Sequence, residues 1–473
     1  MARFFRVVRR AIVWGLLGLL VLVVVVFAIN ARDEDLSPEA QALLQVPQNP
    51  YKPEENIYVA LAGLEAPAGQ SVITAGQARI ARYNEQVDDS FKDPLYELKN
   101  PAWADPAALN FAGKANCESP RDYAFWACVR DNRSRVIALL AANSELVERY
   151  RTLQQLPAYI ETERASVMTD IIVPPSELRT LFLAGFALAM QTGDAAQRRA
   201  AMADLGGDMD LWRRVLNGEG ALISKMIAIA CLQNDYLVLS DLIADPSAPI
   251  SDDIGSYLQK PAGTEWNIGK AFAAEFRVSA FIFRQEIAVG ESDWQPPDDP
   301  ASPVRRWFNR HMWNPIESWF FKINATENLQ ARLMSQLAQF AAMGPVTYAT
   351  QRAKYQAWED QQSKMLKVQA IYNPVGNVIV SIAAPAYRDY LLRPYDAAAL
   401  KRLVLLSMEI RRKQVSYSGI PDFMKKHSEL STHPADGSPF IWNPATGEIS
   451  IHTVAHQRPD RRFSVQIWRR PGN

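Results

Sequence analysis

The sequence predicts a mainly α-helical fold: an N-terminal transmembrane helix, an irregular multi-helix domain outside the membrane, and a small antiparallel β-meander at the C-terminus. Three observations lead to this fold class. Residues 11–29 form an uninterrupted apolar run, apolar residues recur at three- and four-residue steps through most of the remaining chain, and apolar and polar residues alternate only near its end. These patterns divide the chain into four segments: 1–36, 37–115, 116–396 and 397–473.

The first segment carries the apolar run and its charged flanks. As a helix, the run spans roughly 28 Å, which matches the hydrocarbon core of a bilayer. Because arginine is costly to move across a bilayer, the basic residues before the run predict a cytoplasmic N-terminus and place the remaining chain outside. In a bacterium this topology means an inner-membrane protein with a periplasmic bulk, and the partner of residues 11–29 is lipid. The residues assigned to the anchor are Arg3, Arg6, Arg9, Arg10, Trp14 and Phe27.

A cleaved signal peptide is the competing interpretation, because it has the same order of basic and apolar regions. Its apolar region normally runs about 7–15 residues, which is shorter than this run. The nearest cleavage pattern also has Ile29 and Ala31 where two small residues are needed. The sequence therefore favours an uncleaved anchor and leaves cleavage open.

Composition supports a large folded domain and argues against nucleic acid as a partner. The chain has 473 residues, of which 48% are hydrophobic, so it can bury a sizeable core. Its 51 basic residues are balanced by 51 acidic residues, whereas phosphate binding requires a basic surface.

The three cysteines predict one disulfide and one free thiol. Cys117 and Cys128 are spaced for a short covalent loop, which an oxidising compartment such as the periplasm permits. Cys231 lies in an apolar stretch, where a buried thiol packs as a small hydrophobic side chain. No Cys-x-x-Cys pair occurs, so zinc-ribbon and thioredoxin-like chemistry have no basis in the sequence.

Residues 37–115 are rich in proline and alanine and predict an extended stalk with short helices, one of them over 71–86. Residues 116–396 predict helix after helix, with Gly193-Asp194 and Gly206-Gly207-Asp208 as turns between antiparallel pairs. Tetratricopeptide-type arrays stack similar pairs, but neither their 34-residue period nor their marker residues occur here, which favours an irregular helical domain. The expected helices cover 133–153, 176–190 (capped by Ser176), 195–205, 211–216, 221–244, 268–289, 328–343, 348–368 and 397–413.

An aromatic segment over residues 292–323 interleaves rings with basic side chains. Such a combination is typical of an interfacial helix, which buries rings at the level of the lipid headgroups. The alternative is a loop folded against the body, which the prolines of this segment favour. A lipid-facing or partner-binding surface would consist of Trp307, Phe308, Trp313, Trp319, Phe320 and Phe321.

The end of the chain changes character. Residues 448–454 and 463–467 alternate apolar and polar side chains, and with residues near Trp442 they predict a three-stranded meander. The order of helix, Ile420-Pro421-Asp422-Phe423, Asp436-Gly437-Ser438-Pro439-Phe440-Ile441-Trp442 and Gly447 resembles the C-terminal modules of type II secretion pseudopilins. This resemblance covers residues 397–456 and implies a small sheet after a helix.

The rest of the chain departs from that family. The anchor lacks the Gly-Phe-Thr-Leu-x-Glu processing motif and the body is far longer, so the resemblance does not imply pilus assembly. The anchor, the Cys117–Cys128 spacing and Asn373-Pro374-Val375-Gly376 are together similar to uncharacterised single-pass inner-membrane proteins of proteobacteria. That resemblance implies no activity.

The sequence carries no catalytic, metal or cofactor motif. His452 and His456 lie four apart on a predicted strand, which separates them by about 13 Å, too far to share a metal. Glu161 and Glu163 have no partner that the sequence identifies. We therefore expect no cofactor, and an envelope protein as partner.

These observations predict a membrane-anchored periplasmic binding or scaffolding protein of unspecified oligomeric state. An anchored hydrolase acting on peptidoglycan or another glycan is the alternative, which two carboxylates meeting across a cleft would support. A weaker alternative is a component of an envelope assembly or secretion system.

Overall fold

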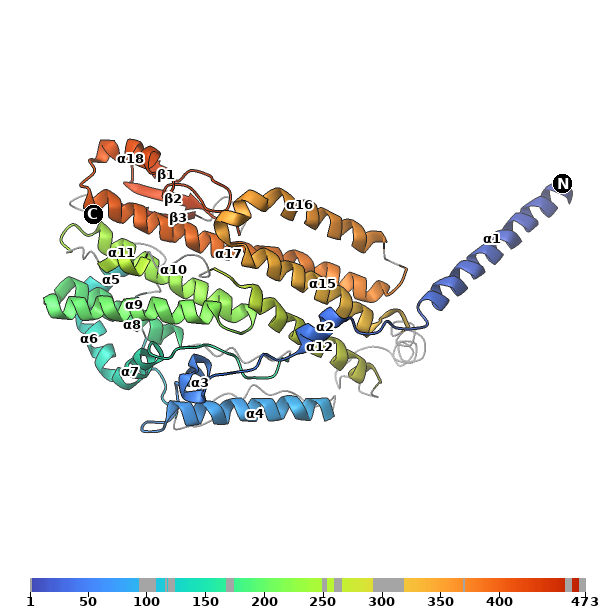
Figure 1. The fold of residues 1–473 in the computed structure, drawn as a ribbon, viewed down its shortest axis with the longest axis horizontal. Coiled ribbons are helices and arrows are strands. Elements are labelled where there is room, and N and C mark those ends of the chain that lie inside the picture. Colours follow the sequence, from blue (N-terminus) through green and yellow to red (C-terminus); the bar gives the residue numbers. More distant parts are fainter. Residues whose placement is uncertain are drawn as a thin grey trace.

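The computed structural model of the chain is an elongated bundle of helices with a small C-terminal sheet (Figure 1). One long helix, α1, projects from the bundle. The mainly α prediction and the three-stranded meander are confirmed. The structure describes residues 2–92, 108–114, 117, 124–166, 174–248, 253–258, 266–291, 319–368, 371–455 and 462–467. The helices and strands are α1 (Ala2–Ile29), α2 (Pro38–Leu44), η1 (Pro53–Glu55), α3 (Ile57–Ala62), α4 (Val72–Lys92), α5 (Ala124–Asp131), α6 (Arg133–Ala142), α7 (Ser144–Leu153), α8 (Ser176–Thr192), α9 (Ala195–Asn217), α10 (Leu222–Ala244), α11 (Asp253–Leu258), α12 (Gly269–Glu291), α15 (Ile323–Ala342), α16 (Gly344–Val368), α17 (Pro374–Arg412), η3 (Tyr417–Gly419), α18 (Ile420–Lys426), β1 (Ile441–Asn443), β2 (Glu448–His452) and β3 (Arg462–Gln466).

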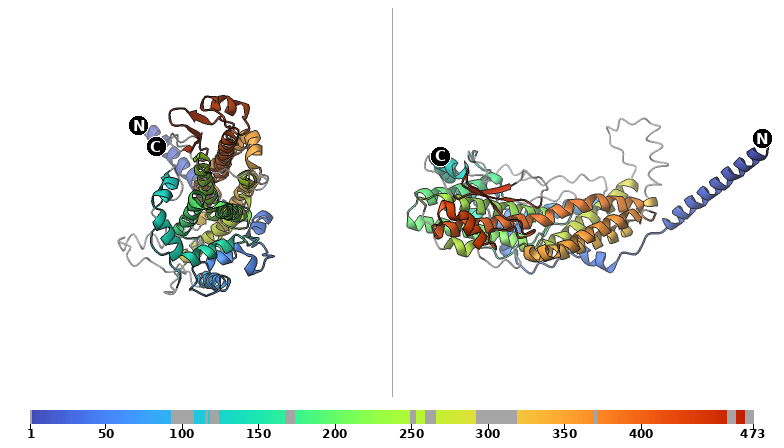
Figure 2. Two further views of the ribbon diagram at one scale, coloured as in Figure 1. Left: turned by 90° about the vertical axis from the view of Figure 1, so that its left-hand side faces the viewer. Right: turned by 90° about the horizontal axis from the view of Figure 1, so that it is seen from above.

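Helix α10 forms the centre of the body. It contacts α9 and α17 most extensively, and α8, α12 and β3 as well. Figure 2 shows the long helices running side by side along the body. A helix that is apolar all round must be buried, and although α10 is long and apolar enough to cross a membrane, 72% of it is buried inside the body. It is therefore the core helix.

A buried ionic network lies between α8, α9 and α10. The guanidinium of Arg179 forms ion pairs with Asp208 and Asp235. The Oδ1 atom of Asp208 also accepts hydrogen bonds from the Tyr150 hydroxyl and from Trp212 Nε1. Burial raises the pKa of Asp235 against the opposing effect of Arg179. Buried charges persist only when paired, so this network fixes how the three helices pack.

The predicted turn at Gly206-Gly207-Asp208 is wrong, because α9 continues through it. A Cβ atom at Gly206 would lie 2.2 Å from the ring of Tyr257, and one at Gly207 would lie 2.4 Å from the side chain of Gln154. These glycines therefore permit close side-chain approach to a helix. The Gly193-Asp194 turn is confirmed, and Asp194 caps α9 through the amides of residues 196 and 197.

Residues 37–92 differ from the expected stalk, because they pack on the body. Every residue of α3 is buried, and the Ile57 amide donates to the Ala158 carbonyl. Arg149 of α7 donates hydrogen bonds to the carbonyls of Leu64, Ala66 and Pro67. The prolines interrupt helices here without extending the chain away from the core.

Helix α17 is much longer than the predicted helix over 397–413. It runs through Pro385 and Pro394, each of which removes a backbone hydrogen bond and usually ends a helix. Packing against α10 and α15 overrides this preference. The boundary predicted between residues 396 and 397 therefore falls inside one helix. The predicted cap at Ser176 is also wrong, since α8 starts at that residue and has no side-chain cap.

The sheet has the order β1-β2-β3, with both neighbouring pairs antiparallel. Ile449 and Ile451 of β2 are buried and pair with Val465 and Phe463 of β3. Strands β2 and β3 contact α17, and β3 also contacts α10. The sheet is thus an integral part of the helical body.

The cysteine predictions agree with the structure. The sulfur atoms of Cys117 and Cys128 lie 2.10 Å apart, at disulfide-bonding distance. Cys231 is a buried free thiol.

Candidate functional site

Two features of the described chain are candidates for function: the junction between α1 and the body, and a pocket beside the C-terminal sheet. The junction begins at Asn30, the residue after α1. Its side chain is fully buried. Its Nδ2 atom donates to the carbonyls of Val26, at 2.9 Å, and Ile371, at 2.7 Å, while its Oδ1 accepts from the Asn373 amide at 2.8 Å. One asparagine thus joins the end of α1 to the start of α17.

Asn373 is the second centre of the junction. It adopts a left-handed backbone conformation with φ of 50°, which asparagine tolerates better than most residues. Its Oδ1 accepts from the amides of Lys322, at 2.9 Å, and Gly376, at 3.3 Å, and its Nδ2 donates to Thr326 Oγ1 at 2.8 Å. A Cβ atom at Gly376 would lie 1.9 Å from that Oγ1 atom. The Asn-Pro-Val-Gly motif therefore starts α17 and ties it to α15.

The acidic residues after α1 cap α15 from a distant part of the chain. Asp33 accepts hydrogen bonds from the amides of Asn324, at 2.9 Å, and Ala325, at 3.1 Å. Asn328 Nδ2 donates to Glu34 Oε2 at 3.0 Å, and its Oδ1 accepts from the Ser37 amide at 2.7 Å. Negative charge at a helix N-terminus is favourable. The chain leaving α1 is consequently bonded to the body at each step.

Part of the predicted aromatic surface also belongs to the junction. Trp319 Nε1 donates to the Phe27 carbonyl at 3.1 Å, and the ring of Phe27 packs edge-on against Phe320 at 5.1 Å. Phe321 packs against Phe283 of α12. The structure therefore places these three predicted aromatics against α1 and the body. Trp307, Phe308 and Trp313 lie outside the described residues.

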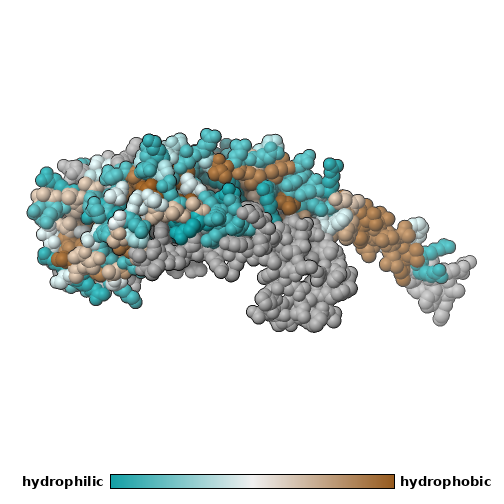
Figure 3. Space-filling view, turned by 90° about the horizontal axis from the view of Figure 1, so that it is seen from below, coloured by the Kyte–Doolittle hydropathy of each residue, from teal (hydrophilic) through white to brown (hydrophobic). Residues whose placement is uncertain are grey.

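The predicted anchor residues lie on α1, whose apolar run has no buried residue and contacts the described body through Phe27 at its last turn. Figure 3 shows this helix as an apolar rod that projects from the body, whose coloured residues on this face are mostly hydrophilic. None of the window Ile12–Ile29, with a mean hydropathy of 3.1, is buried. Arg9, Arg10 and Trp14 are exposed, and Arg3 and Arg6 belong to the same helix.

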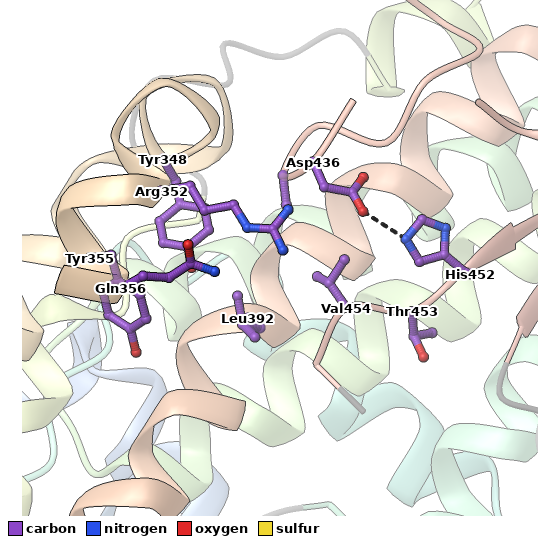
Figure 4. Close-up of a pocket in the computed structure, with 10 residues that line it drawn as sticks. Tyr348, Arg352, Tyr355, Gln356, Leu392, Asp436, His452, Thr453 and Val454 are labelled. Carbon is purple, nitrogen blue, oxygen red and sulfur yellow. Dashed lines mark hydrogen bonds and ion pairs between the residues drawn. The ribbon is translucent and has the colours of Figure 1, made fainter. Parts of the chain in front are cut away.

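The second feature is a pocket of about 260 Å³ between α16, α17 and the C-terminal sheet (Figure 4). On the α16 side, the exposed side chains of Arg352 and Gln356 stand one helical turn apart. Arg352 makes no ion pair with the described residues. The other lining residues supply two phenol rings, an apolar floor and a polar wall: Tyr348, Tyr355, Leu392, Ala435, Asp436, His452, Thr453 and Val454.

Asp436 and His452 lie together on the polar wall, and Ser438 contacts both of them. His452 Nε2 is 2.9 Å from Asp436 Oδ2, and Ser438 Oγ donates to Asp436 Oδ1 at 2.7 Å. A nucleophilic triad needs the serine and the carboxylate on opposite ring nitrogens. Here Ser438 Oγ lies 3.2 Å from Nδ1 and 3.3 Å from Nε2 of His452, beside the ring, and its proton goes to Asp436. The cluster is therefore a hydrogen-bonded turn in which Ser438 and His452 both contact the Asp436 carboxylate.

Burial would raise the pKa of Asp436, but hydrogen bonds from Ser438 and His452 outweigh it and lower that pKa. Gly437, with φ of 73°, allows the turn that brings Asp436 and Ser438 to one side. The pocket thus presents a carboxylate that stays ionised opposite Arg352, which has no ion-pair partner in the described part of the chain. Such a site suits a ligand that carries both an anionic group and a hydrogen-bond donor.

Asp396 of α17 fixes the backbone of this wall through hydrogen bonds. Its two oxygens accept from the amides of Val454, at 2.7 Å, and Ala455, at 3.2 Å. The buried ring of His433 lies 3.3 Å from Asp396 Oδ1. The Ala435 amide donates to His433 Nδ1 at 3.2 Å, so in the neutral ring the proton is on Nε2, facing Asp396.

The other predicted candidates have structural roles. His452 lies on strand β2 as expected, and His456 lies outside the described residues. Glu161 has partners that the sequence did not identify: its carboxylate accepts from the Ala221 amide and from Ser224 Oγ at the start of α10. Among the described residues, no group of three or more His, Cys, Asp or Glu side chains is arranged to hold a metal.

Sequence reasoning missed the junction residues Asn30, Asp33 and Asn328, because their partners lie about 290 to 340 positions away. Only the Asn-Pro pair at residues 373 and 374, a common start of a helix, gave a local signal. Comparison with protein-family models, curated proteins and solved structures finds no match for this chain.

Proposed function

We propose that this chain is a single-pass membrane protein that holds a ligand- or partner-binding pocket at a fixed position outside the membrane. In a bacterium, α1 crosses the inner membrane with its N-terminus in the cytoplasm, and the body lies in the periplasm. One observation carries the proposal: an apolar helix with no buried residue in its membrane-length window is followed by a buried asparagine that is bonded into the body.

The exposed run of α1 supports membrane insertion. An unburied apolar surface of this length is unfavourable in water and matches the thickness of a bilayer. The arginines before it support a cytoplasmic N-terminus. Cys117 and Cys128, at bonding distance, fit an oxidising compartment for the body.

The pocket supports binding more than hydrolysis. Glycoside hydrolysis requires two carboxyl groups, and Asp436 is the only carboxylate among the described lining residues. The serine beside it is not placed as a nucleophile. Fixing such a pocket near a membrane raises the effective concentration of membrane-bound partners without new contacts. The pseudopilin-like order of residues 397–456 keeps an envelope-assembly component as a further candidate.

A topology experiment tests the anchoring. Alkaline phosphatase fused after Asn473 is expected to be active in whole cells, because the body is exported, whereas a green fluorescent protein at the same place should be dark. Replacing Arg3, Arg6, Arg9 and Arg10 with glutamate should reduce the phosphatase activity. A bright fluorescent fusion with an inactive phosphatase would contradict the proposal.

Site-specific photocrosslinking tests the pocket. Benzoylphenylalanine at Gln356, which lines the pocket, is expected to give a discrete adduct in intact cells. The same probe at Lys354, an exposed residue of α16 that does not line the pocket, is the matched control. Adducts from both positions, or from neither, would contradict a role of the pocket in binding.

A further inference from the structure

A group of exposed apolar side chains, called the apolar patch below, lies on the segments that receive the end of α1. It consists of Trp319, Ile371, Val378, Ile379 and Ile382, with exposed fractions between 37% and 73%. Large apolar side chains scattered singly on a surface are normal, whereas a group at one place marks an interaction site. Three members lie on the first turns of α17, and Ile371 lies three residues before the start of that helix.

The patch is tied to the end of α1 at two points. The Ile371 carbonyl accepts the 2.7 Å hydrogen bond from Asn30, and Trp319 Nε1 donates to the carbonyl of Phe27. Phe27 belongs to the apolar window of α1. Trp319 and Ile371 are therefore at the depth of the last turn of α1, wherever that helix sits.

We infer that this patch enters the lipid interface of the membrane that α1 crosses. The body would then contact the bilayer surface directly, in addition to being anchored by α1. The inference depends on the membrane insertion of α1 proposed above. Lipid is the occupant because the patch is continuous with the lipid-facing end of α1. The side chain of Lys322, with its Nζ 5.6 Å from the centre of the Trp319 ring, adds the cation and ring typical of a membrane interface.

For the whole patch to reach the interface, the body must be tilted relative to the membrane normal. Ile382 is about 12 Å along the helix from Pro374, whereas the headgroup layer is roughly 5–8 Å thick, so α17 must be inclined to the membrane normal. Figure 1 shows α1 rising from the body at an angle, toward the side occupied by α16 and α17. An upright α1 therefore brings this side of the body closest to the membrane.

Fluorescence quenching in vesicles tests the contact on the full chain. The environment-sensitive label NBD is attached to Ile382→Cys, to Leu22→Cys within α1, and to Ile441→Cys on β1, in separate samples. All three positions are exposed apolar residues, so labelling should not disturb folding. Cys231 is buried and its pKa is raised to about 12, so it does not compete for the reagent. The vesicles contain phosphatidylcholine with or without a doxyl quencher on acyl carbon 5.

The label at Ile382 is expected to lose about half of its fluorescence with the quencher, as an interfacial side chain would, and the label at Ile441 should lose none. Quenching at Leu22 without quenching at Ile382 would overturn the inference and leave the anchor intact. No quenching at Leu22 would show instead that α1 is not in the membrane. If the emission of the Ile382 label is shifted to the blue but is not quenched, the label is in an apolar environment other than lipid. This result would overturn the inference in favour of a protein partner on this patch.

Discussion

Asn30 and Asn373 are 343 residues apart in the chain, yet the amide of Asn373 donates a 2.8 Å hydrogen bond to the side chain of Asn30. Both residues are buried, and both bond to a second element of the body. The N-terminal helix is therefore attached to the body by a defined polar junction.

Replacing Asn30 with alanine should loosen this junction. The variant leaves the Asn373 amide and the Ile371 carbonyl without their partner, and unsatisfied buried groups cost about 1–3 kcal/mol each. We expect amide hydrogen exchange at residues 371–377 to become at least tenfold faster. Asn443→Ala is the control, because the side chain of Asn443 accepts its hydrogen bond from Ala445 in an exposed turn far from the junction. Equal exchange in both variants would contradict the role of Asn30.

Replacing Asp396 with asparagine should release the wall of the pocket. The carboxylate accepts two amides and faces His433, and hydrogen bonds to a charged group contribute about 1.5–3 kcal/mol each. We expect faster proteolysis between residues 427 and 455 while the helical body stays intact. Asp422→Asn, which changes an exposed residue of α18, is the control and should behave as the unaltered chain does. Unchanged proteolysis of Asp396→Asn would contradict the role of Asp396 in holding the pocket wall.

Replacing Gly76 with alanine should separate α4 from α3. A Cβ atom at this position would lie 1.9 Å from the backbone carbonyl of Val59, which cannot move aside as a flexible side chain can. Overpacking of this kind typically costs about 1–3 kcal/mol, and the midpoint of thermal unfolding should fall. Ala78→Ser changes the exposed face of the same helix and should have little effect. If residues 37–92 were a free stalk, neither variant would change the midpoint.

Lys225 should make stability depend on pH. Burial lowers its pKa from 10.5 to about 8, although its Nζ atom donates to the carbonyls of Val215 and Gly218. Between these pH values the unfolded chain holds a proton that the folded chain has lost. The free energy of unfolding therefore rises with pH over this range, by about 3 kcal/mol, and the increment is absent below pH 8.

Urea unfolding at pH 8, 9 and 10 measures this effect as a difference between variants. Lys225→Met should lack the rise, whereas the exposed Lys354→Met should keep it. Parallel pH profiles for the unaltered chain and Lys225→Met would show that the ammonium is not held in a desolvated site.

Much of the helical body was predictable, because its helices bury one face and their apolar residues follow the helical period. The errors arose where local preference conflicts with packing. The predicted helix over 397–413 is only the last part of α17, which runs through Pro385 and Pro394, and the turn predicted at Gly206-Gly207-Asp208 lies inside α9. Tertiary contacts keep both helices continuous. The junction was beyond local reasoning, since the partners of Asn30 are set by the fold as a whole.

The distance between α1 and the body tests the central claim most directly. Spin labels at Leu22→Cys and Lys354→Cys, measured by double electron–electron resonance on the full chain in lipid nanodiscs, report how firmly the two parts are joined. The polar junction predicts one narrow distance distribution, which broadens in Asn30→Ala. A broad distribution in the unaltered chain, typical of a flexible tether, would contradict the account.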